Sequence, residues 1–148
     1  MRYIDTNIII YAIANDVKYG TACKRILMDL EAGKLKACAS VLVLAETLNV
    51  LTKINRMLAA TGKAELDIRK NIDAILSLPI VWFDLNFLII KKAAEYKYKI
   101  SGVDYLHIAS MELNSVKELI SSDKELDKVD SVKRIDPLGY PKWMTGNF

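Results

Sequence analysis

Cysteine, histidine, glycine and proline are all scarce in this sequence. Its 148 residues include two cysteines, one histidine, six glycines and three prolines. Cys23 and Cys38 have neither the density of a secreted disulfide scaffold nor the spacing of metal ligands, and one histidine cannot build a histidine-rich site. The low glycine and proline content excludes collagenous and low-complexity chains. These absences argue against soft-metal chemistry and favour a packed domain.

Long hydrophobic runs are missing as well. Uncharged apolar runs such as 37–45 and 75–83 are about half the length of the ~20 residues that a membrane helix needs. Residues 1–4 have the character of a strand and lack the cationic segment, apolar core and cleavage site of a secretory signal. We therefore expect no membrane association and a cytoplasmic location.

The remaining composition is that of one globular domain. Apolar residues make up 52% of the chain and charged residues 26%, and a chain of this length buries roughly two-thirds of its unfolded surface. The net charge of +3 is too small to indicate a nucleic-acid partner by itself. With no internal repeat or linker, we predict one domain over residues 1–137. The aromatic tail at 138–148 is suited to packing against that domain or a partner.

Short apolar segments alternate with helical patterns along the chain. Strands are predicted at 2–4, 35–39, 80–83, 118–121 and 131–135. Helices are predicted at 8–14, at 21–31, from Ser40 toward Gly62, at 66–78, at 86–98 and at 102–114. Because strands separated by helices imply a parallel sheet covered on both faces, the predicted fold class is α/β.

Two acidic residues follow predicted strands closely. Asp5 comes directly after the first strand, and Asp123 follows Leu119-Ile120 of the fourth strand and two serines. Open α/β folds place their ligands at this carboxyl edge of the sheet. Each residue also has a structural explanation, because Asp5 is a good helix N-cap and Asp123 lies where Ser122 and Glu125 would form a capping box.

A third acidic residue, Glu46, interrupts an apolar run in a helix that we expect to be mostly buried. A carboxylate there costs several kcal/mol unless it is paired, protonated or bound to a cation. On a helical wheel Glu46 shares one side with Asn49, Lys53 and Arg56, so a solvated polar stripe explains it equally well.

The fourth acidic residue, Asp104, opens another predicted helix. It lies three residues after Ser101, in the arrangement of a capping box. His107 lies one turn farther along, and a local hydrogen bond between Asp104 and His107 is one explanation of the pair. We interpret this histidine as structural and leave it outside the candidate site.

The structural explanations do not predict that two acids follow strand ends while two lie on helices that crowd the same sheet edge. Four carboxylates held together repel one another unless a cation lies between them. All-oxygen ligation suits Mg²⁺ or Mn²⁺, which retain water and accept phosphate oxygens. Such a centre activates water for in-line attack on phosphorus. The predicted metal-binding and catalytic residues are Asp5, Glu46, Asp104 and Asp123.

Four segments occur in order along the chain: Tyr3-Ile4-Asp5-Thr6-Asn7, Ala39-Ser40 leading to Glu46, Asp104 with Ile108-Ala109, and Ile120-Ser121-Ser122-Asp123. Together they resemble the PIN-domain family of metal-dependent ribonucleases. The resemblance covers residues 1 to about 137, and it implies a three-layer α/β/α sandwich around a central parallel sheet. Two positions depart from the family's common pattern, because Ser121 replaces a usual Thr and Leu126 stands where an aromatic residue often follows the last acid. Neither change removes a metal ligand.

The resemblance also implies site-ordering residues and partners. Thr6, Asn7 and Ser121 would order the acids by hydrogen bonds, and Asp127 or Asp130 is a further acid that could assist. The substrate would be RNA. Many small members are toxins of toxin–antitoxin pairs, so a small antitoxin protein and a homodimer are expected partners. Other members are stand-alone RNA-processing nucleases.

Cationic residues must hold a polyanion near an acidic centre without pairing with the acids. Lys53 and Arg56 continue the Glu46 stripe outward along the predicted helix. They are the predicted contacts to substrate phosphates.

Two other functions compete with a nuclease. A phosphotransfer domain would use Asp5 as a nucleophile and form an aspartyl phosphate, yet the first strand lacks the Asp-x-Asp of the common haloacid-type phosphatases. A non-catalytic PIN-like binding module would hold a metal structurally or act through a partner. The presence of all four acids argues against such a module.

Overall fold

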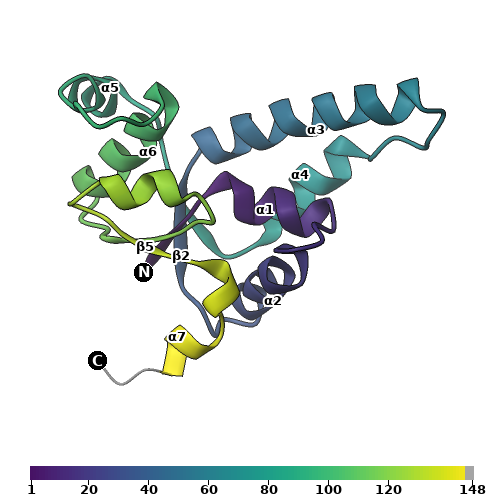
Figure 1. Ribbon diagram of the computed structural model, residues 1–148, viewed down its shortest axis with the longest axis horizontal. Helices are drawn as coiled ribbons and strands as arrows, with labels where there is room; N and C mark the ends of the chain where they lie inside the picture. Colours follow the sequence, from purple (N-terminus) through teal and green to yellow (C-terminus); the bar gives the residue numbers. More distant parts are fainter. Residues whose placement is uncertain (146–148) are drawn as a thin grey trace.

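The computed structural model describes residues 1–145, and its elements alternate between strand and helix (Figure 1). The strands are β1 (Arg2–Ile4), β2 (Ala37–Ser40), β3 (Ile80–Phe83), β4 (Glu118–Ile120) and β5 (Lys133–Ile135). The α-helices are α1 (Thr6–Ile13), α2 (Gly20–Glu31), α3 (Leu42–Ala60), α4 (Ile68–Ser77), α5 (Phe87–Ala93), α6 (Gly102–Leu113) and α7 (Lys142–Thr145). Two 3₁₀ turns are η1 (Lys124–Lys128) and η2 (Pro137–Gly139).

The five strands form one parallel sheet in the order β3-β2-β1-β4-β5. From the central β1 the chain builds outward to β2 and β3, and it later returns to the other side of β1 with β4 and β5. The strand order therefore reverses between β1 and β4, where Ile4 pairs with Ile120. In open α/β sheets, ligands bind beyond the carboxyl ends of the strands at such a reversal.

Successive residues of β1 face two different cores, because side chains alternate across a sheet. Ile4 packs with Ile8 of α1 and Ile26 of α2 on one face. Tyr3 packs with Ile108 of α6 and with residues of β4 and η1 on the other. Helices thus cover both faces of the sheet, and the predicted three-layer α/β/α sandwich is confirmed (Figure 1).

Helix α3 is much less buried than the sequence led us to expect. Only Val43, Thr47 and Leu51 are buried, whereas Leu48 is 47% and Met57 69% exposed. The reason is that α3 extends well past the sheet, so that, within the described chain, its outer half has only α4 and the connecting segment 61–67 beside it (Figure 1). The expectation of a mostly buried helix was therefore wrong.

Two predicted helix ends also differ from the structure. Ser40 still belongs to β2, so α3 begins at Leu42, although the Ser40 hydroxyl accepts a hydrogen bond from the Leu42 N–H at 3.1 Å. Helix α5 ends at Ala93 rather than continuing to residue 98. There the backbone changes to tighter bonds, such as Tyr96 N–H to Ala93 C=O at 3.2 Å, which typically end an α-helix.

The described part of the tail lies against the domain. The hydroxyl of Tyr140, which is 8% exposed, donates to the Asp29 carboxylate of α2. The Trp143 ring packs edge-on against Tyr140, and the Arg2 guanidinium lies 4.8 Å from the centroid of the Trp143 ring. The division into a domain at 1–137 and a tail at 138–148 stays a prediction, and residues 146–148 lie outside the described residues.

None of the helices within residues 1–145 combines the length and apolarity needed to cross a membrane.

We predict that Tyr140→Phe lowers the free energy of unfolding at neutral pH. The hydrogen bond from Tyr140 is the main cause that lowers the pKa of Asp29, so the ionised carboxylate stabilises the fold. This contribution is present above the ordinary carboxyl pKa of 3.8 and is lost as the pH falls through the lower folded value. Urea denaturation at several pH values should show a deficit that shrinks in acid. The control is Tyr19→Phe, because the Tyr19 hydroxyl has no hydrogen bond among the described residues. This change should alter neither the free energy of unfolding nor its dependence on pH. A deficit in Tyr140→Phe that does not change with pH would contradict the assignment.

Candidate acidic site

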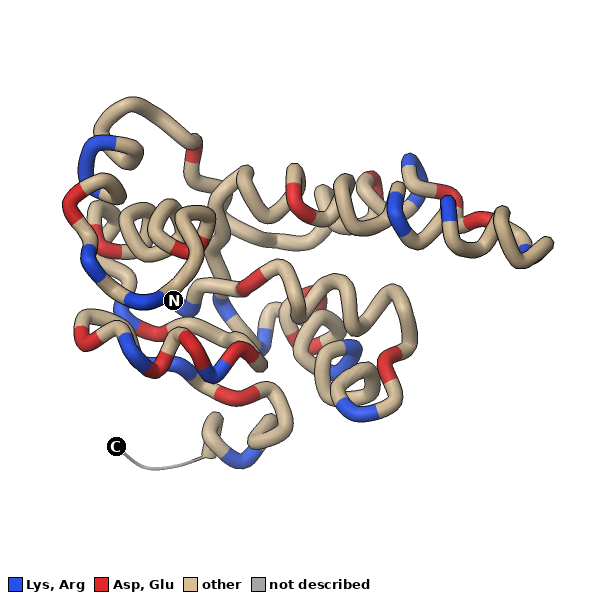
Figure 2. Tube along the Cα trace, turned by 45° about the horizontal axis from the view of Figure 1, so that its top comes forward, with Lys and Arg blue, Asp and Glu red and all other residues tan. Residues whose placement is uncertain are grey.

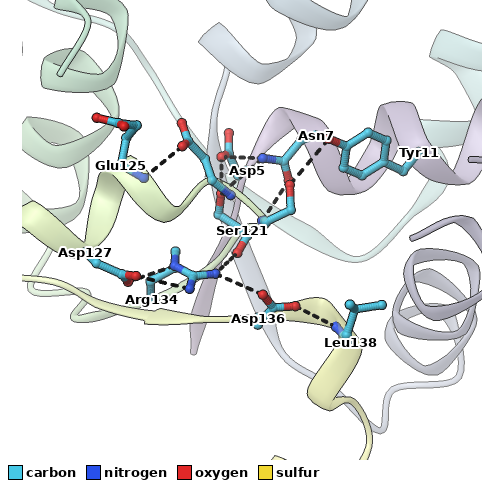
Figure 3. Close-up of polar contacts among 11 residues, drawn as sticks. Asp5, Asn7, Tyr11, Ser121, Glu125, Asp127, Arg134, Asp136 and Leu138 are labelled. Atoms are coloured by element: carbon cyan, nitrogen blue, oxygen red, sulfur yellow. Dashed lines mark hydrogen bonds and ion pairs between the residues drawn. The ribbon is translucent and has the colours of Figure 1, made fainter. Parts of the chain in front are cut away.

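The pairing of β1 with β4 brings Asp5 and Ser121 side by side just beyond the strand ends. The Asp5 N–H donates to the carbonyl of Ile120 at 3.1 Å, which extends the ladder by one residue. The Ser121 hydroxyl donates to Asp5 Oδ2 at 2.6 Å, and Asn7 Nδ2 donates to both Asp5 Oδ2 and Ser121 Oγ at 3.0 Å (Figure 3). The predicted site-ordering residues Asn7 and Ser121 thus contact Asp5 directly.

Asp5 is at once the N-cap of α1 and part of this polar cluster. Its Oδ1 accepts the Thr6 N–H at 2.7 Å, and its backbone is extended as an N-cap requires. Burial raises the pKa of Asp5, and the charge of His107 and the hydrogen bonds from Ser121 and Thr6 offset part of that rise. The structural and the functional interpretation of Asp5 are therefore compatible.

Glu46 reaches the same region from the second turn of α3. Its Oε1 accepts a hydrogen bond from Thr6 Oγ1 at 2.9 Å and lies 2.5 Å from His107 Nε2. Burial by itself raises the pKa of Glu46, but the hydrogen bond and charge of His107 and the hydrogen bond from Thr6 outweigh it, so the pKa is lowered overall. Glu46 is therefore a paired carboxylate and not a member of a purely solvated stripe.

His107 contacts the acidic cluster, and this contact was not predicted from the sequence. It is 4% exposed, and its hydrogen-bond partners are Glu46 and the Tyr3 hydroxyl, which lies 2.7 Å from Nδ1. A hydrogen bond between Asp104 and His107, one explanation of their spacing, is absent from the described residues. Burial lowers the pKa of His107, but the hydrogen bond to Glu46 and the nearby acids raise it more. Its position one helical turn after Asp104 was the available signal, because such residues share a helix face.

Asp104 and Asp123 both lie at the first turn of a helical element. Ser101 caps α6 as predicted, and its hydroxyl also donates to Asp104 Oδ2 at 2.8 Å. For η1 the prediction was wrong, because Asp123 and not Ser122 is the cap. Asp123 Oδ1 accepts the Glu125 N–H at 3.0 Å, and the Asp123 N–H donates to Ser121 Oγ at 3.0 Å.

All four predicted acids line one cavity of about 330 Å³. Within residues 1–145, Asp5, Asp104 and Asp123 form no ion pair with a lysine, arginine or histidine, and Glu46 pairs only with His107. Ser121 is fully buried behind the cavity, while Lys53 and Arg56 are exposed farther along α3. The lining residues are Asp5, Thr6, Asn7, Ile10, Tyr11, Glu46, Val50, Asp104 and Asp123.

The cavity offers oxygen ligands from carboxylates that come from separate elements. Within the described chain, no group of three or more histidine, cysteine or acidic side chains is already arranged to hold a metal ion. Mg²⁺ in proteins is commonly held by one or two carboxylates while it retains several waters, and Mn²⁺ accepts the same oxygen ligands. The donor set and the lack of competing lysine or arginine partners therefore fit a hydrated divalent cation.

Arg134 of β5 supports the site from behind. Its Nη1 donates to the Ser121 carbonyl at 2.8 Å, and its guanidinium pairs with Asp127 at 2.8 Å and Asp136 at 3.3 Å (Figure 3). The hydrogen bond from Arg134 lowers the pKa of Asp127. Asp127 is thus engaged elsewhere, and neither it nor the exposed Asp130 lines the cavity.

Arg134→Gln should destabilise the fold by about 1–3 kcal/mol, because a side chain that is only 10% exposed would lose hydrogen bonds to two carboxylates and a carbonyl. Arg69→Gln is the matched control, since Arg69 is 93% exposed and pairs with Asp73 at 3.8 Å. That change should stay within ~0.5 kcal/mol. Urea denaturation of both variants tests this, and equal effects would show that Arg134 does not support the strand end.

Comparisons with known proteins agree with this architecture. The sequence matches the PIN domain family over residues 2–132. No curated protein is significantly similar in sequence. Among solved structures, VapBC2 from Rickettsia felis, bound to a DNA fragment from its promoter, superposes with a TM-score of 0.66 at 19% identity, covering 92% of this chain and 98% of that chain.

Two further solved structures share the fold. VapC20 from Mycobacterium tuberculosis, a sarcin-ricin loop cleaving toxin, has a TM-score of 0.66 at 19% identity and covers 88% of this chain and 95% of its own. FitAcB from Neisseria gonorrhoeae has a TM-score of 0.57 at 15% identity and covers 93% of this chain and 99% of its own. At such low identities these structures show a common fold and no more. The sequence match to the PIN domain family, in contrast, extends over most of the chain. This chain belongs to the PIN domain family.

Proposed function

We propose that this protein is a divalent-metal-dependent endoribonuclease. The observation that carries the proposal is that four carboxylates from different elements line one cavity at the strand-order reversal. In a PIN domain this is the arrangement suited to hydrolysis of a phosphodiester. The proposed metal-binding and catalytic residues are Asp5, Glu46, Asp104 and Asp123.

The chain's own residues hold this cavity in a defined shape. A bound Mg²⁺ or Mn²⁺ would supply an activated water and stabilise the departing oxyanion. Thr6 fixes two of the acids at once, since its N–H binds Asp5 and its hydroxyl binds Glu46. Asn7 and Ser121 hold the other Asp5 oxygen. These contacts support the proposed site-ordering roles of Thr6, Asn7 and Ser121.

The proposed phosphate contacts are Lys53 and Arg56, about two and three turns beyond Glu46 on α3. Both are exposed, and neither forms an ion pair within residues 1–145. Figure 2 shows basic residues along the projecting α3–α4 arm. An RNA strand lying along this arm would reach the acidic cavity at its inner end.

The biological role that we propose is the toxin of a toxin–antitoxin pair. Three structures with this fold are described as a toxin–antitoxin complex from Klebsiella pneumoniae and as VapBC complexes from Rickettsia felis and Salmonella typhimurium. By this analogy the partners would be a small antitoxin and a second copy of this chain. A stand-alone RNA-processing nuclease would use the same cavity.

We expect Asp104→Asn to lose metal-dependent RNA cleavage by about 100-fold or more, because even partners that only orient a metal ligand cost 10–100-fold. The assay is cleavage of labelled single-stranded RNA with Mg²⁺, Mn²⁺ or EDTA. Asp73→Asn is the matched control, since Asp73 is 67% exposed on α4. Thermal melting checks that both variants fold. Metal-dependent cleavage that persists in Asp104→Asn would refute the proposed site.

The double change Lys53→Gln and Arg56→Gln should weaken RNA binding and its salt dependence. Two lost phosphate contacts reduce the slope of log affinity against log salt by about 1.4 for a single strand. Binding is measured in the Asp104→Asn background, so that the RNA stays intact. The control is Lys36→Gln with Lys117→Gln, because both lysines are exposed just before β2 and β4, at the opposite edge of the sheet. Equal slopes for the two double variants would contradict the assignment.

A further inference from the structure

A buried hydrogen-bond chain runs from the sheet to the acidic cavity. The Ser40 N–H donates to the Tyr3 hydroxyl at 3.0 Å, Tyr3 Oη lies 2.7 Å from His107 Nδ1, and His107 Nε2 lies 2.5 Å from Glu46 Oε1. Ser40 and Tyr3 are fully buried, and His107 is 4% exposed. These hydrogen bonds thus connect buried polar atoms of β2, β1 and α6 to Glu46 of α3, whose side chain is 32% exposed.

The position of the hydrogen on His107 follows from counting donors. A carboxylate only accepts, so the short contact with Glu46 requires a hydrogen on Nε2. Tyr3 Oη already accepts from Ser40, and its own hydrogen has one acceptor among the described residues, which is His107 Nδ1. Whether the ring is neutral or protonated, Nε2 therefore carries a hydrogen that is directed at Glu46.

This donor decides which Glu46 oxygen is free. Oε1 accepts from both Thr6 Oγ1 and His107 Nε2, whereas Oε2 accepts no hydrogen bond from residues 1–145. Glu46 lines the cavity together with Asp5, Asp104 and Asp123. Two donors on one oxygen fix the carboxylate against rotation and leave the other oxygen for a ligand in the cavity.

We propose that His107, anchored by Tyr3, is a positioning residue that holds Glu46 in the orientation in which it binds the catalytic cation. This inference rests on the proposed function. It replaces the interpretation of His107 as a merely structural histidine. A histidine that only filled the core would need no partner in the cavity, and an apolar residue of similar size would replace it without loss at the site.

The single histidine makes a direct test feasible in the unaltered chain. A tag-free protein with ¹⁵N-labelled histidine has one set of ring signals in a long-range ¹H–¹⁵N correlation spectrum. We expect a hydrogen on Nε2, and we expect these signals to shift on addition of Mg²⁺ with the midpoint of Mg²⁺ binding measured by calorimetry. A ring whose only hydrogen is on Nδ1 would overturn the proposal, as would signals unchanged at saturating Mg²⁺.

Two variants separate positioning from packing. His107→Leu keeps bulk but removes the donor, and it should weaken Mg²⁺ binding about tenfold or more, as losses of ligand-orienting partners do. His107→Gln retains an N–H donor that can reach Glu46, and its Mg²⁺ affinity should stay within about threefold of the parent. Equal Mg²⁺ affinities in the two variants would overturn the role of His107.

Tyr3→Phe tests the anchor and provides a second route if His107→Leu does not fold. It removes one hydroxyl and should weaken Mg²⁺ binding in the same direction. Unchanged Mg²⁺ affinity and ring signals in Tyr3→Phe would refute the anchoring. If the parent protein binds neither Mg²⁺ nor Mn²⁺, the proposed metal-dependent function fails together with this inference. If the parent protein binds the ion but His107→Leu and His107→Gln bind it with equal affinity, only the role of His107 is wrongly assigned.

Discussion

The site depends on one constraint, which is that the carboxylate of Asp5 must remain next to the buried end of β4. The pairing of Ile4 with Ile120 leaves Asp5 and Ser121 as neighbours beyond the ladder. Desolvation makes the charged form of Asp5 costly and raises its pKa. The Thr6 N–H, the Asn7 amide and the Ser121 hydroxyl supply the hydrogen bonds that such a buried carboxylate requires.

The distribution of positive charge around the sheet edge keeps the acids available. Arg134 binds Asp127 and Asp136 behind β4, so its charge is used outside the cavity. Among residues 1–145, His107 is the one basic ion-pair partner of the four cavity acids, and it contacts a single oxygen of Glu46. Because an arginine or lysine paired with these acids would compete with a cation, this separation is a physical requirement of the proposed chemistry and not an accident of packing.

Local capping and site formation use the same residues here. Asp5 caps α1 and Asp123 caps η1, while Asp104 lies in the first turn of α6 next to its cap Ser101. The helical elements of a parallel α/β fold begin near the carboxyl edge of the sheet, so acids that favour helix N-termini are brought to that edge as well. Capping was therefore a poor reason to doubt these residues.

Sequence periodicity was sufficient for the strands, for the alternation of strand and helix and for a parallel sheet covered on both faces, because these follow from local patterns of apolar side chains. The resemblance to PIN domains added the three-layer sandwich. The positions of four acids relative to these elements, together with the resemblance, selected the candidate site, yet they could not show that the acids line one cavity, since this depends on the strand order around β1. Tertiary structure alone decided that α3 extends past the sheet with Leu48 exposed, that Arg134 supports Ser121, and that His107 faces Glu46. Each of these contacts joins residues that are distant in the chain or depends on which helix face meets a neighbour, and no local pattern encodes that choice.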